Sequence, residues 1–380
     1  MPPEHALEWL DSNIAALPGE AVTLGAAYAR VLARPVQAAA ALPATALAGR
    51  NGYAVHIRAT IGASSYSPLR LRLRKGSGDG GLAVDEAVAV ASGAPLPEGA
   101  DGVLPREEAE VLGSVLEIYG AVAAGEHVLA AGAEAAAGAT VLASGHRLRA
   151  HDLAQLAALG VETVMVVRRP RVRLVAAPGG PLAAGDTAGL MLESLVRRDG
   201  GAVEGRHLAT DAAALEARLA APGGDLLLVY GGSGDGEGDF AAAALARGDV
   251  LEVHGVAINP GETVGLGRLG GRPVILLPGA PLACLCAYEL LAGRAVRRLA
   301  GDGGDWPYVV RHATLQSKVA SRLGRLEFCR VRLEGDRAVP LAVSEGRLLA
   351  SAVAADGFVI IPMHSEGYPE GTEVEVHVFQ

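Results

Sequence analysis

Apolar positions along the chain follow different spacings, and each spacing predicts a different kind of element. Between residues 5 and 33 they recur at helical spacing, which predicts two short helices, the second ended by Pro35. From about 43 to 132, short alternating runs stand between Gly and Pro residues, as in a small sheet-rich module. A joint rich in Ala and Gly then leads to a predicted helix, HDLAQLAALG, which Gly160 closes.

The pattern changes again after Val172. Aliphatic strands alternate with helices as far as about Ala300, which predicts a parallel sheet covered on both faces. After Gly304 the chain returns to short strands and turns, typical of a small barrel or sandwich. We therefore predict an α/β multidomain protein.

Composition excludes several classes of function. The chain has 380 residues, half of them apolar, and a formal net charge of −9, so it is expected to fold and carries no basic nucleic-acid footprint. Cys284, Cys286 and Cys329 form no paired framework and indicate buried, reduced thiols. The amino terminus has no secretory pattern, and the longest apolar stretch, 274–288, is too short for a membrane helix. We expect a soluble, cytoplasmic protein that binds neither nucleic acid nor membrane.

A glycine-rich loop carries the sharpest candidate chemistry. In LLLVYGGSGDGEGDF, residues 226–240, a strand runs into Gly231 and Gly232 before a helix that begins near Phe240. Such a loop lets backbone N–H groups approach a phosphate, and the helix amino terminus favours its charge. Asp235 and Asp239 are candidate oxygen ligands for Mg²⁺. The alternative is a surface turn with solvated carboxylates.

Two further turns are expected near that loop. Pro278 and Gly279 follow an aliphatic strand, and the turn AINPGETVG, 257–265, lies between them and the loop in sequence. Strand carboxyl ends are where open α/β sheets bind ligands, although each turn alone is weak evidence. No HExxH, GxSxG or P-loop lysine is present, so zinc-peptidase, acyl-transfer and P-loop nucleotide-hydrolase chemistry lack their central residues.

Taken in order, these pieces resemble the molybdopterin molybdenumtransferase family over essentially the whole chain. The family boxes DGYA and TGAxxPxGADxV are matched by NGYA at 51–54 and SGAPLPEGADGV at 92–103, followed by Glu107. SSGGVSxGxxD is matched by VYGGSGDGEGD at 229–239, KPGKP by NPGET at 259–263, and LPGNP by LPGAP at 277–281. The carboxyl-terminal runs GRLEFCRVRL and ADGFVIIP match as well.

The resemblance implies four parts: a helical and linker region at 1–42 with 133–168, an inserted β-rich subdomain at 43–132, a molybdopterin-binding three-layer α/β domain at 169–300, and a β-barrel at 301–380. It implies adenylylated molybdopterin and molybdate as substrates, Mg²⁺, a homodimer, and a client molybdoenzyme or other cofactor-synthesis protein as partner. Asp239 is the catalytic candidate, with Asp235 as a second metal ligand. The positions matched to cofactor binding are Gly231, Gly232, Ser233, Pro260, Gly261, Pro278, Gly279, Ser92 and Glu107.

Departures from the family pattern fall on polar site positions. Asn51 replaces the aspartate of DGYA, Asn259 and Glu262 replace both lysines of KPGKP, and Ala280 replaces the asparagine of LPGNP. The TGDE turn reads PGGP at 178–181, and the basic RxxGxD stretch reads LAAGAEA at 129–135. Losing two cations weakens the hold on a dianion such as molybdate.

Two interpretations remain open. The sequence favours a catalytically impaired relative that binds a pterin or acts as a scaffold; the alternative is an active molybdenumtransferase whose catalytic groups have moved. A single-domain adenylyltransferase relative explains only residues 170–300.

Overall fold

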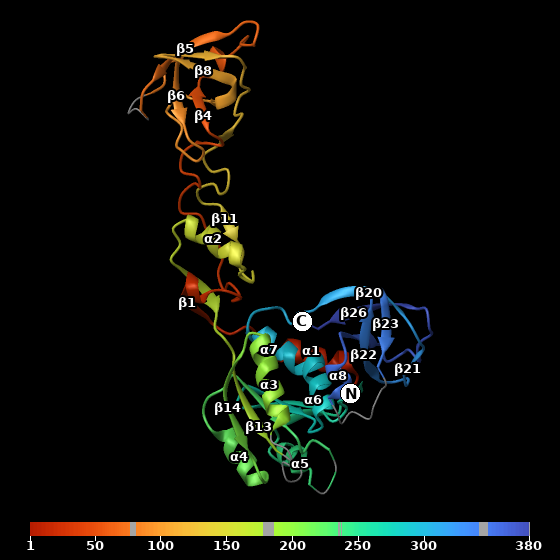
Figure 1. The fold of residues 1–380 in the computed structure, drawn as a ribbon. Coiled ribbons are helices and arrows are strands. Elements are labelled where there is room, and N and C mark those ends of the chain that lie inside the picture. The colour runs from red at the N-terminus through yellow and green to blue at the C-terminus, as the bar shows by residue number, and fades with distance from the viewer. Residues whose placement is uncertain (77–80, 178–185, 235, 237, 342–348, 380) are drawn as a thin grey trace. The chain divides into compact units, whose positions relative to one another are not determined.

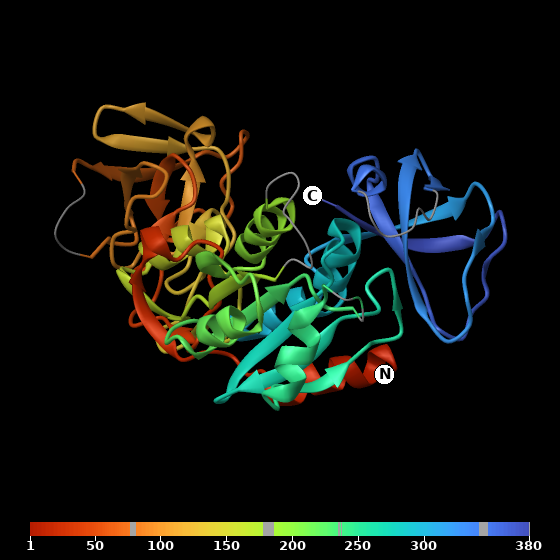
Figure 2. The same ribbon diagram turned by 90° about the horizontal axis from the view of Figure 1, so that it is seen from below.

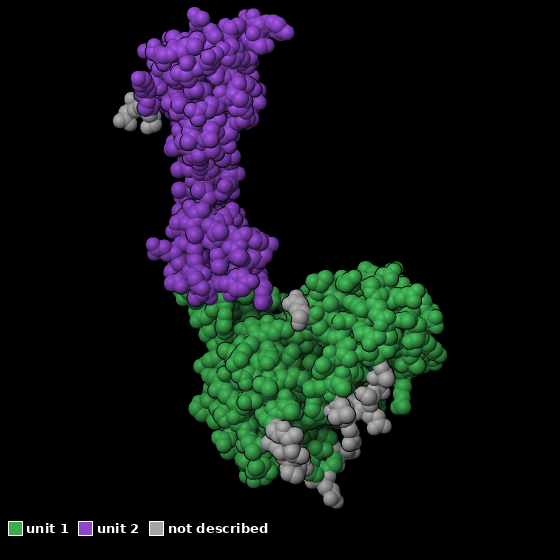
Figure 3. Space-filling view, viewed as in Figure 1, with its two compact units in different colours: residues 1–22, 29–33, 165–380 green, residues 23–28, 34–164 purple. Residues whose placement is uncertain are grey.

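Two compact units make up the chain in the computed structural model, which describes residues 1–76, 81–177, 186–234, 236, 238–341 and 349–379 (Figure 1). Unit 1 comprises residues 1–22, 29–33 and 165–380, and unit 2 comprises residues 23–28 and 34–164 (Figure 3). The chain therefore passes between the units several times near its amino terminus. None of the helices among these residues is long and apolar enough to cross a membrane.

Unit 1 is built around one six-stranded sheet. Its strand order is β14-β13-β15-β19-β18-β16. The first four strands are parallel, and β18 and β16 add an antiparallel edge. The strands are β13 (Arg171–Ala176), β14 (Ala202–Leu208), β15 (Leu226–Tyr230), β16 (Leu251–His254), β18 (Gly265–Leu269) and β19 (Arg272–Leu277). The predicted α/β sheet is confirmed.

Helices cover both faces of this sheet because its strands are apolar on both sides. In β15, Leu226, Leu228 and Tyr230 face one core, whereas Leu227 and Val229 face the other. The first core is covered by α1 (Pro3–Asn13), α3 (Thr187–Arg198), α6 (Pro281–Ala287), the π-helix Tyr288–Ala292 and α7 (Gly293–Leu299). The second is covered by α4 (Ala212–Ala220) and α5 (Phe240–Arg247). The result is a three-layer α/β domain.

One predicted helix is wrong. After α1, residues Gly19–Thr23 form strand β1, and only a short 3-10 turn, Leu24–Ala26, follows. β1 alternates between exposed and half-buried positions and pairs with β12 (Thr163–Val167). The apolar residues of a five-residue run fit both the helical and the strand period. Here pairing with β12, which lies far away in sequence, selects the strand.

The carboxyl-terminal part is a closed barrel. Strands β22, β23, β20, β26 and β24 pair in that order, and an additional β22–β24 pairing closes the ring. Figure 2 shows these blue strands curving around one another. Their bounds are β20 (Val309–Leu315), β22 (Leu326–Glu334), β23 (Arg337–Pro340), β24 (Gly357–Ile361) and β26 (Glu373–Val378), accompanied by β21 (Val319–Ala320), α8 (Ala350–Val353) and β25 (Gly367–Tyr368). The barrel alternative of the sequence prediction is confirmed.

Unit 2 contains a six-stranded sheet of order β7-β4-β6-β5-β9-β8, as the alternating runs predicted. Its strands are β4 (Gly52–Val55), β5 (Leu69–Arg74), β6 (Glu86–Val90), β7 (Gly102–Pro105), β8 (Ala109–Leu112) and β9 (Val115–Ile118). Two short ladders, β3 (Leu47–Ala48) with β10 (Val128–Leu129) and β2 (Val36–Gln37) with β11 (Thr140–Leu142), join the incoming and outgoing chain. The predicted four-part domain boundaries stay a prediction.

The first turn of helix α2 (Ala150–Ala158) contains a buried carboxylate, Asp152. Asp152 accepts hydrogen bonds from the Arg149 backbone N–H at 2.8 Å and from Arg149 Nε at 3.0 Å, and its Oδ2 lies 2.7 Å from His146 Nε2. Hydrogen bonding to Arg149, and then to His146, holds the pKa of Asp152 well below its ordinary value. Gly160, with φ of +74°, ends the helix region as predicted.

We expect Asp152→Asn to destabilise unit 2 by about 1 kcal/mol at neutral pH, the size of a typical net hydrogen bond. The folded pKa of Asp152 is below its unfolded value, so this stabilisation is present above pH 4 and is lost as pH falls through the folded pKa. Urea unfolding at pH 7 and pH 3 tests this, because the gap between variant and wild type should shrink at pH 3. An equal gap at both pH values would contradict it.

Candidate functional site

The glycine loop lies at the carboxyl end of β15, as predicted. Gly231 has φ of +90° and Gly232 φ of +59°, both in the left-handed region that favours glycine. A Cβ on Gly232 would lie 2.9 Å from the carbonyl oxygen of Ala177, the residue that follows β13. The Gly231 N–H donates to the Leu277 carbonyl at 3.1 Å and is therefore already occupied. The loop is thus packed tightly between two neighbouring strand ends.

The turn at 259–263 touches this loop through its last residue. The hydroxyl oxygens of Ser233 and Thr263 lie 2.7 Å apart, and His254 Nε2 is 3.0 Å from the Ser233 carbonyl oxygen. Ser233 is only 4% exposed, so its hydroxyl needs the Thr263 partner. Two of the three turns matched from sequence are therefore brought together.

The third turn, at 277–281, joins the same edge. A Cβ built on Gly279 would lie 3.1 Å from Gly231 Cα, so these two backbones are in direct contact. Pro278 is buried, and Ala280 begins α6 without a side-chain cap, where the family motif has asparagine. A Cβ on Gly261 would lie 3.3 Å from the Ala283 carbonyl, which puts the 259–263 turn, with the buried Pro260, against α6 as well.

Asp239 lies at the start of α5, where the sequence predicted it. Its Oδ2 accepts the Gly236 N–H at 3.2 Å, closing the loop on itself rather than capping the helix. Asp235, the second candidate metal ligand, lies outside the described residues, as does the PGGP turn at 178–181. Among the residues that are described, no group of three or more His, Cys, Asp or Glu side chains is arranged to hold a metal. The predicted role of Mg²⁺ stays a prediction.

The substituted turn positions have new partners. Asn259 Nδ2 donates to both carboxylate oxygens of Glu327, at 2.9 and 2.8 Å, from β17 (Ile258–Asn259) to β22 of the barrel. Glu327 is 4% exposed, and burial raises its pKa above the ordinary value despite this hydrogen bond. Glu262 is exposed, and its Oε2 accepts the Gly261 N–H at 3.1 Å. The turn therefore presents one amide and one carboxylate where the family pattern has two ammonium groups.

Sequence reasoning missed both Glu327 and its neighbour Arg330. The Arg330 side chain is fully buried on β22, and its Nη1 donates to the Phe328 carbonyl at 3.0 Å. Among the described residues, Nε and Nη2 of Arg330 have no nitrogen or oxygen partner, and the guanidinium lies beside the buried Cys286 thiol, whose pKa it lowers against the larger effect of burial. The alternation of EFCRVRL placed a strand here but gave no sign that this strand meets the 259–263 turn.

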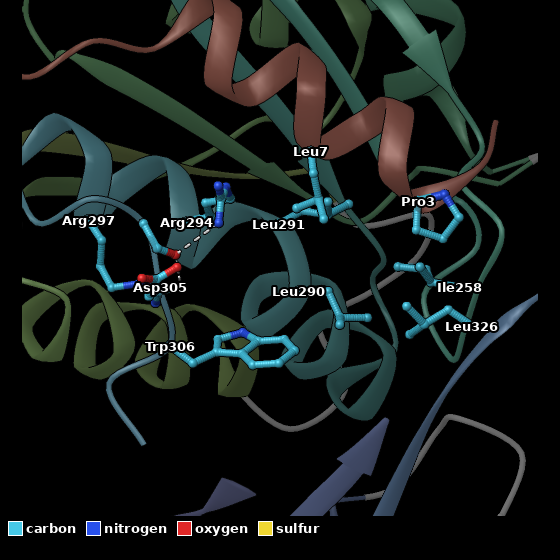
Figure 4. A pocket seen from close by; sticks show the side chains of 11 residues that line it. Pro3, Leu7, Ile258, Leu290, Leu291, Arg294, Arg297, Asp305, Trp306 and Leu326 are labelled. Atoms are coloured by element: carbon cyan, nitrogen blue, oxygen red, sulfur yellow. Dashed lines mark hydrogen bonds between the residues drawn. The ribbon is translucent and has the colours of Figure 1, made fainter. Parts of the chain in front are cut away.

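A cavity of about 250 Å³ lies next to the residues that precede Asn259 and Glu327 (Figure 4). Ile258 and Leu326, each one residue before Asn259 and Glu327, line it together with Leu290, Leu291 and Trp306. Figure 4 shows Arg294, Arg297 and Asp305 gathered at its opposite end. None of the predicted site residues lines this cavity, so it is separate from the glycine loop.

The remaining predicted residues lie in unit 2. Asn51 Oδ1 accepts the Ser92 N–H at 2.8 Å, and Ser92 Oγ donates to the Gly49 carbonyl at 3.3 Å. Glu107 pairs with Arg50, and its own backbone N–H followed by Arg50 lowers its pKa. Asn51, Ser92 and Glu107 are all exposed. They form one exposed region of unit 2 around the start of β4.

Comparison with known families covers nearly the whole chain. Residues 1–160 match the MoeA N-terminal region (domain I and II), residues 175–298 match a probable molybdopterin binding domain, and residues 312–379 match the MoeA C-terminal region (domain IV). The three matches follow one another in the order of the structural parts described above.

Individual relatives are similar to this chain over nearly their full lengths. Molybdopterin molybdenumtransferase 2 of Mycobacterium tuberculosis is 29% identical, with 93% of this chain and 94% of that protein covered. The molybdopterin molybdenumtransferase of Staphylococcus aureus is 23% identical over 99% of this chain and 95% of its own length. A crystal structure of the molybdopterin biosynthesis MoeA protein from Pyrococcus horikoshii is 30% identical, with a TM-score of 0.82 over 100% of this chain and 99% of that one. The chain belongs to the MoeA family of molybdopterin molybdenumtransferases.

Proposed function

We propose that this protein is an active molybdopterin molybdenumtransferase, which inserts molybdate into adenylylated molybdopterin with release of AMP. The observation that carries this proposal is the contact of three matched loops, 231–233, 259–263 and 278–280, at one sheet edge. Such an edge, with helix amino termini beside it, suits a phosphate-bearing ligand. The full-length resemblance to named molybdenumtransferases supports the same substrate.

Arg330 supplies a cation that the sequence motifs alone do not show. It lies three residues after Glu327 on β22, close enough to Asn259's partner for its charge to lower the Glu327 pKa against the effect of burial. The Arg330 guanidinium is fully buried, so its charge acts on the 259–263 turn through Glu327, whose negative charge it offsets, and not by direct contact with a substrate oxyanion. We infer that Arg330 compensates in part for the lysines lost at Asn259 and Glu262.

A second candidate, binding without turnover, is favoured by the 259–263 turn itself. Asn259 is held by Glu327, and Glu262 adds a negative charge to the turn, both unfavourable to a dianion. In this alternative the protein holds a pterin or finished cofactor for a client molybdoenzyme. A homodimer, a client partner and a role for Mg²⁺ remain predictions under either candidate.

Turnover distinguishes the two candidates. The purified protein is given adenylylated molybdopterin, Mg²⁺ and molybdate, and AMP release and reconstitution of an apo-molybdoenzyme are measured beside an intact family member. We expect molybdate-dependent AMP release comparable with that of the reference enzyme. Arg330→Met should lower this rate, whereas Arg332→Met, which changes an exposed arginine on the same strand, should not.

The result that contradicts active insertion is equally clear. Wild-type protein that binds molybdopterin but releases no AMP, together with restored release in an Asn51→Asp, Asn259→Lys, Glu262→Lys triple variant, would establish the impaired interpretation. Denaturing the protein as isolated and finding a pterin fluorophore measures binding independently of turnover.

A further inference from the structure

Tyr230 occupies a position beside the glycine loop that the family motif gives to a serine. It is the last residue of β15 and pairs in register with Ala176 of β13 and Leu277 of β19. Its side chain is 4% exposed and faces the core beneath α3. Tyr230 therefore lies at the point where the sheet ends and the loop begins.

The hydroxyl of Tyr230 reaches the start of α3. It donates to Asp186 Oδ2 at 2.7 Å, and Asp186 Oδ1 in turn accepts the Gly189 N–H at 2.8 Å as the N-cap of that helix. Burial raises the pKa of Tyr230 well above its ordinary value, and Asp186 raises it further, so the hydroxyl keeps its proton and remains a donor. One buried side chain thus ties a strand end to a helix start.

Gly189 leaves the space that this arrangement needs. A Cβ at Gly189 would lie 2.5 Å from the Tyr230 hydroxyl oxygen and 2.1 Å from Asp186 Oδ2. A tyrosine at the strand end, an aspartate at the helix cap and a glycine in the first turn are therefore fitted to one another. A serine at position 230 is too short to extend from the strand end to Asp186.

We propose that Tyr230 is a positioning residue for the phosphate-bearing substrate. Its hydrogen bond to Asp186 holds the amino terminus of α3 near the end of β15. Gly231 and Gly232 follow Tyr230 directly, so the same bond holds α3 beside the glycine loop. Preorganised backbone at a sheet edge lowers the cost of binding, because less backbone has to be ordered when the ligand arrives. This inference rests on the proposed function, since it concerns how tightly adenylylated molybdopterin is held.

Tyr230→Phe tests it, with Tyr288→Phe as the matched control. Tyr288 is also a buried tyrosine of unit 1, and its hydroxyl donates to Asp199 Oδ2 at 3.0 Å, away from the glycine loop. Both variants should lower Tm by similar amounts because each loses one tyrosine–aspartate hydrogen bond. Only Tyr230→Phe should raise KM for adenylylated molybdopterin, by roughly tenfold, with kcat changed much less.

The remaining outcomes separate this inference from the proposed function. One such outcome is a wild type that turns over while KM changes equally little in the folded Tyr230→Phe and Tyr288→Phe variants. That result would overturn the positioning role of Tyr230 and leave the proposed function in place. A wild type that binds no molybdopterin would remove the proposed function and this inference with it. Where Tyr230→Phe fails to fold, Asp186→Ser keeps a capping oxygen for the Gly189 N–H but removes Oδ2, the partner of the Tyr230 hydroxyl, and it should raise KM in the same direction.

Discussion

Replacing Gly232 by alanine is expected to remove most substrate affinity while leaving the protein folded. At φ of +59° an alanine is strained by roughly 1–2 kcal/mol. Its Cβ would also lie 2.9 Å from the Ala177 carbonyl oxygen and 3.1 Å from Ala241 Cβ, so the loop has to move. Together these effects should lower the free energy of unfolding by about 2 kcal/mol and the affinity for molybdopterin at least ~10-fold.

Gly270→Ala is the matched control for this prediction. Gly270 has φ of +56°, nearly the same as Gly232, but a Cβ there meets no atom within 4 Å. The Gly270→Ala variant should lose only the stability that backbone strain costs, and it should keep full affinity for molybdopterin. Calorimetric titration with molybdopterin and urea unfolding of both variants measure the two quantities. Equal affinities in the two variants would show that the position of the 231–233 loop does not control binding.

Arg198→Met is expected to cause the largest loss of stability. Arg198 Nη1 donates to Glu289 Oε1 at 2.7 Å and Nη2 to Asp199 Oδ2 at 2.9 Å, and it also donates to the Tyr308 hydroxyl. Burial by itself would lower the Arg198 pKa, but the two carboxylates raise it above its ordinary value. The Glu289 and Asp199 side chains are 1% and 0% exposed, so removing the cation leaves buried negative charge undercompensated.

Breaking such a pair costs about 3 kcal/mol, at the lower end of the range for buried pairs because Arg297 still lies 3.1 Å from Asp199. Urea unfolding at pH 7 measures this loss, and Arg332→Met is the control. The Arg332–Glu334 pair is 2.6 Å long but about half exposed on both sides, so its loss should cost less than ~0.5 kcal/mol. Similar losses in the two variants would contradict the structural role of the Arg198 cluster.

The same cluster joins the π-helix between α6 and α7 to the chain that leads into the barrel. Glu289 lies in the π-helix Tyr288–Ala292, and its carbonyl accepts the Trp306 indole N–H at 2.7 Å. Tyr308, two residues later, donates its hydroxyl to Glu289 Oε1 at 2.9 Å. The chain leading into the barrel is therefore fastened to the α/β domain by both the backbone and the side chain of one residue.

Local patterns were sufficient for much of the fold. Continuous aliphatic runs such as DLLLVY predicted buried parallel strands because a sheet with two covered faces has no polar side. The ends of strands were equally readable, since Gly231, Gly232 and Gly279 stand where backbone approaches leave no room for a Cβ or require positive φ. The strand after α1 was missed because a short apolar run does not specify its own period.

Side-chain partners were decided only by the tertiary structure. Sequence motifs identified Asn259 as a lost lysine, but not that Glu327, 68 residues away, would take its amide, nor that Arg330 would be buried on the same strand. The motif around Tyr230 likewise did not show that its hydroxyl would lie against Asp186 and Gly189. Hydrogen bonds and ion pairs act over a few ångströms in space, and the chain brings such groups together only after its strands and helices have packed.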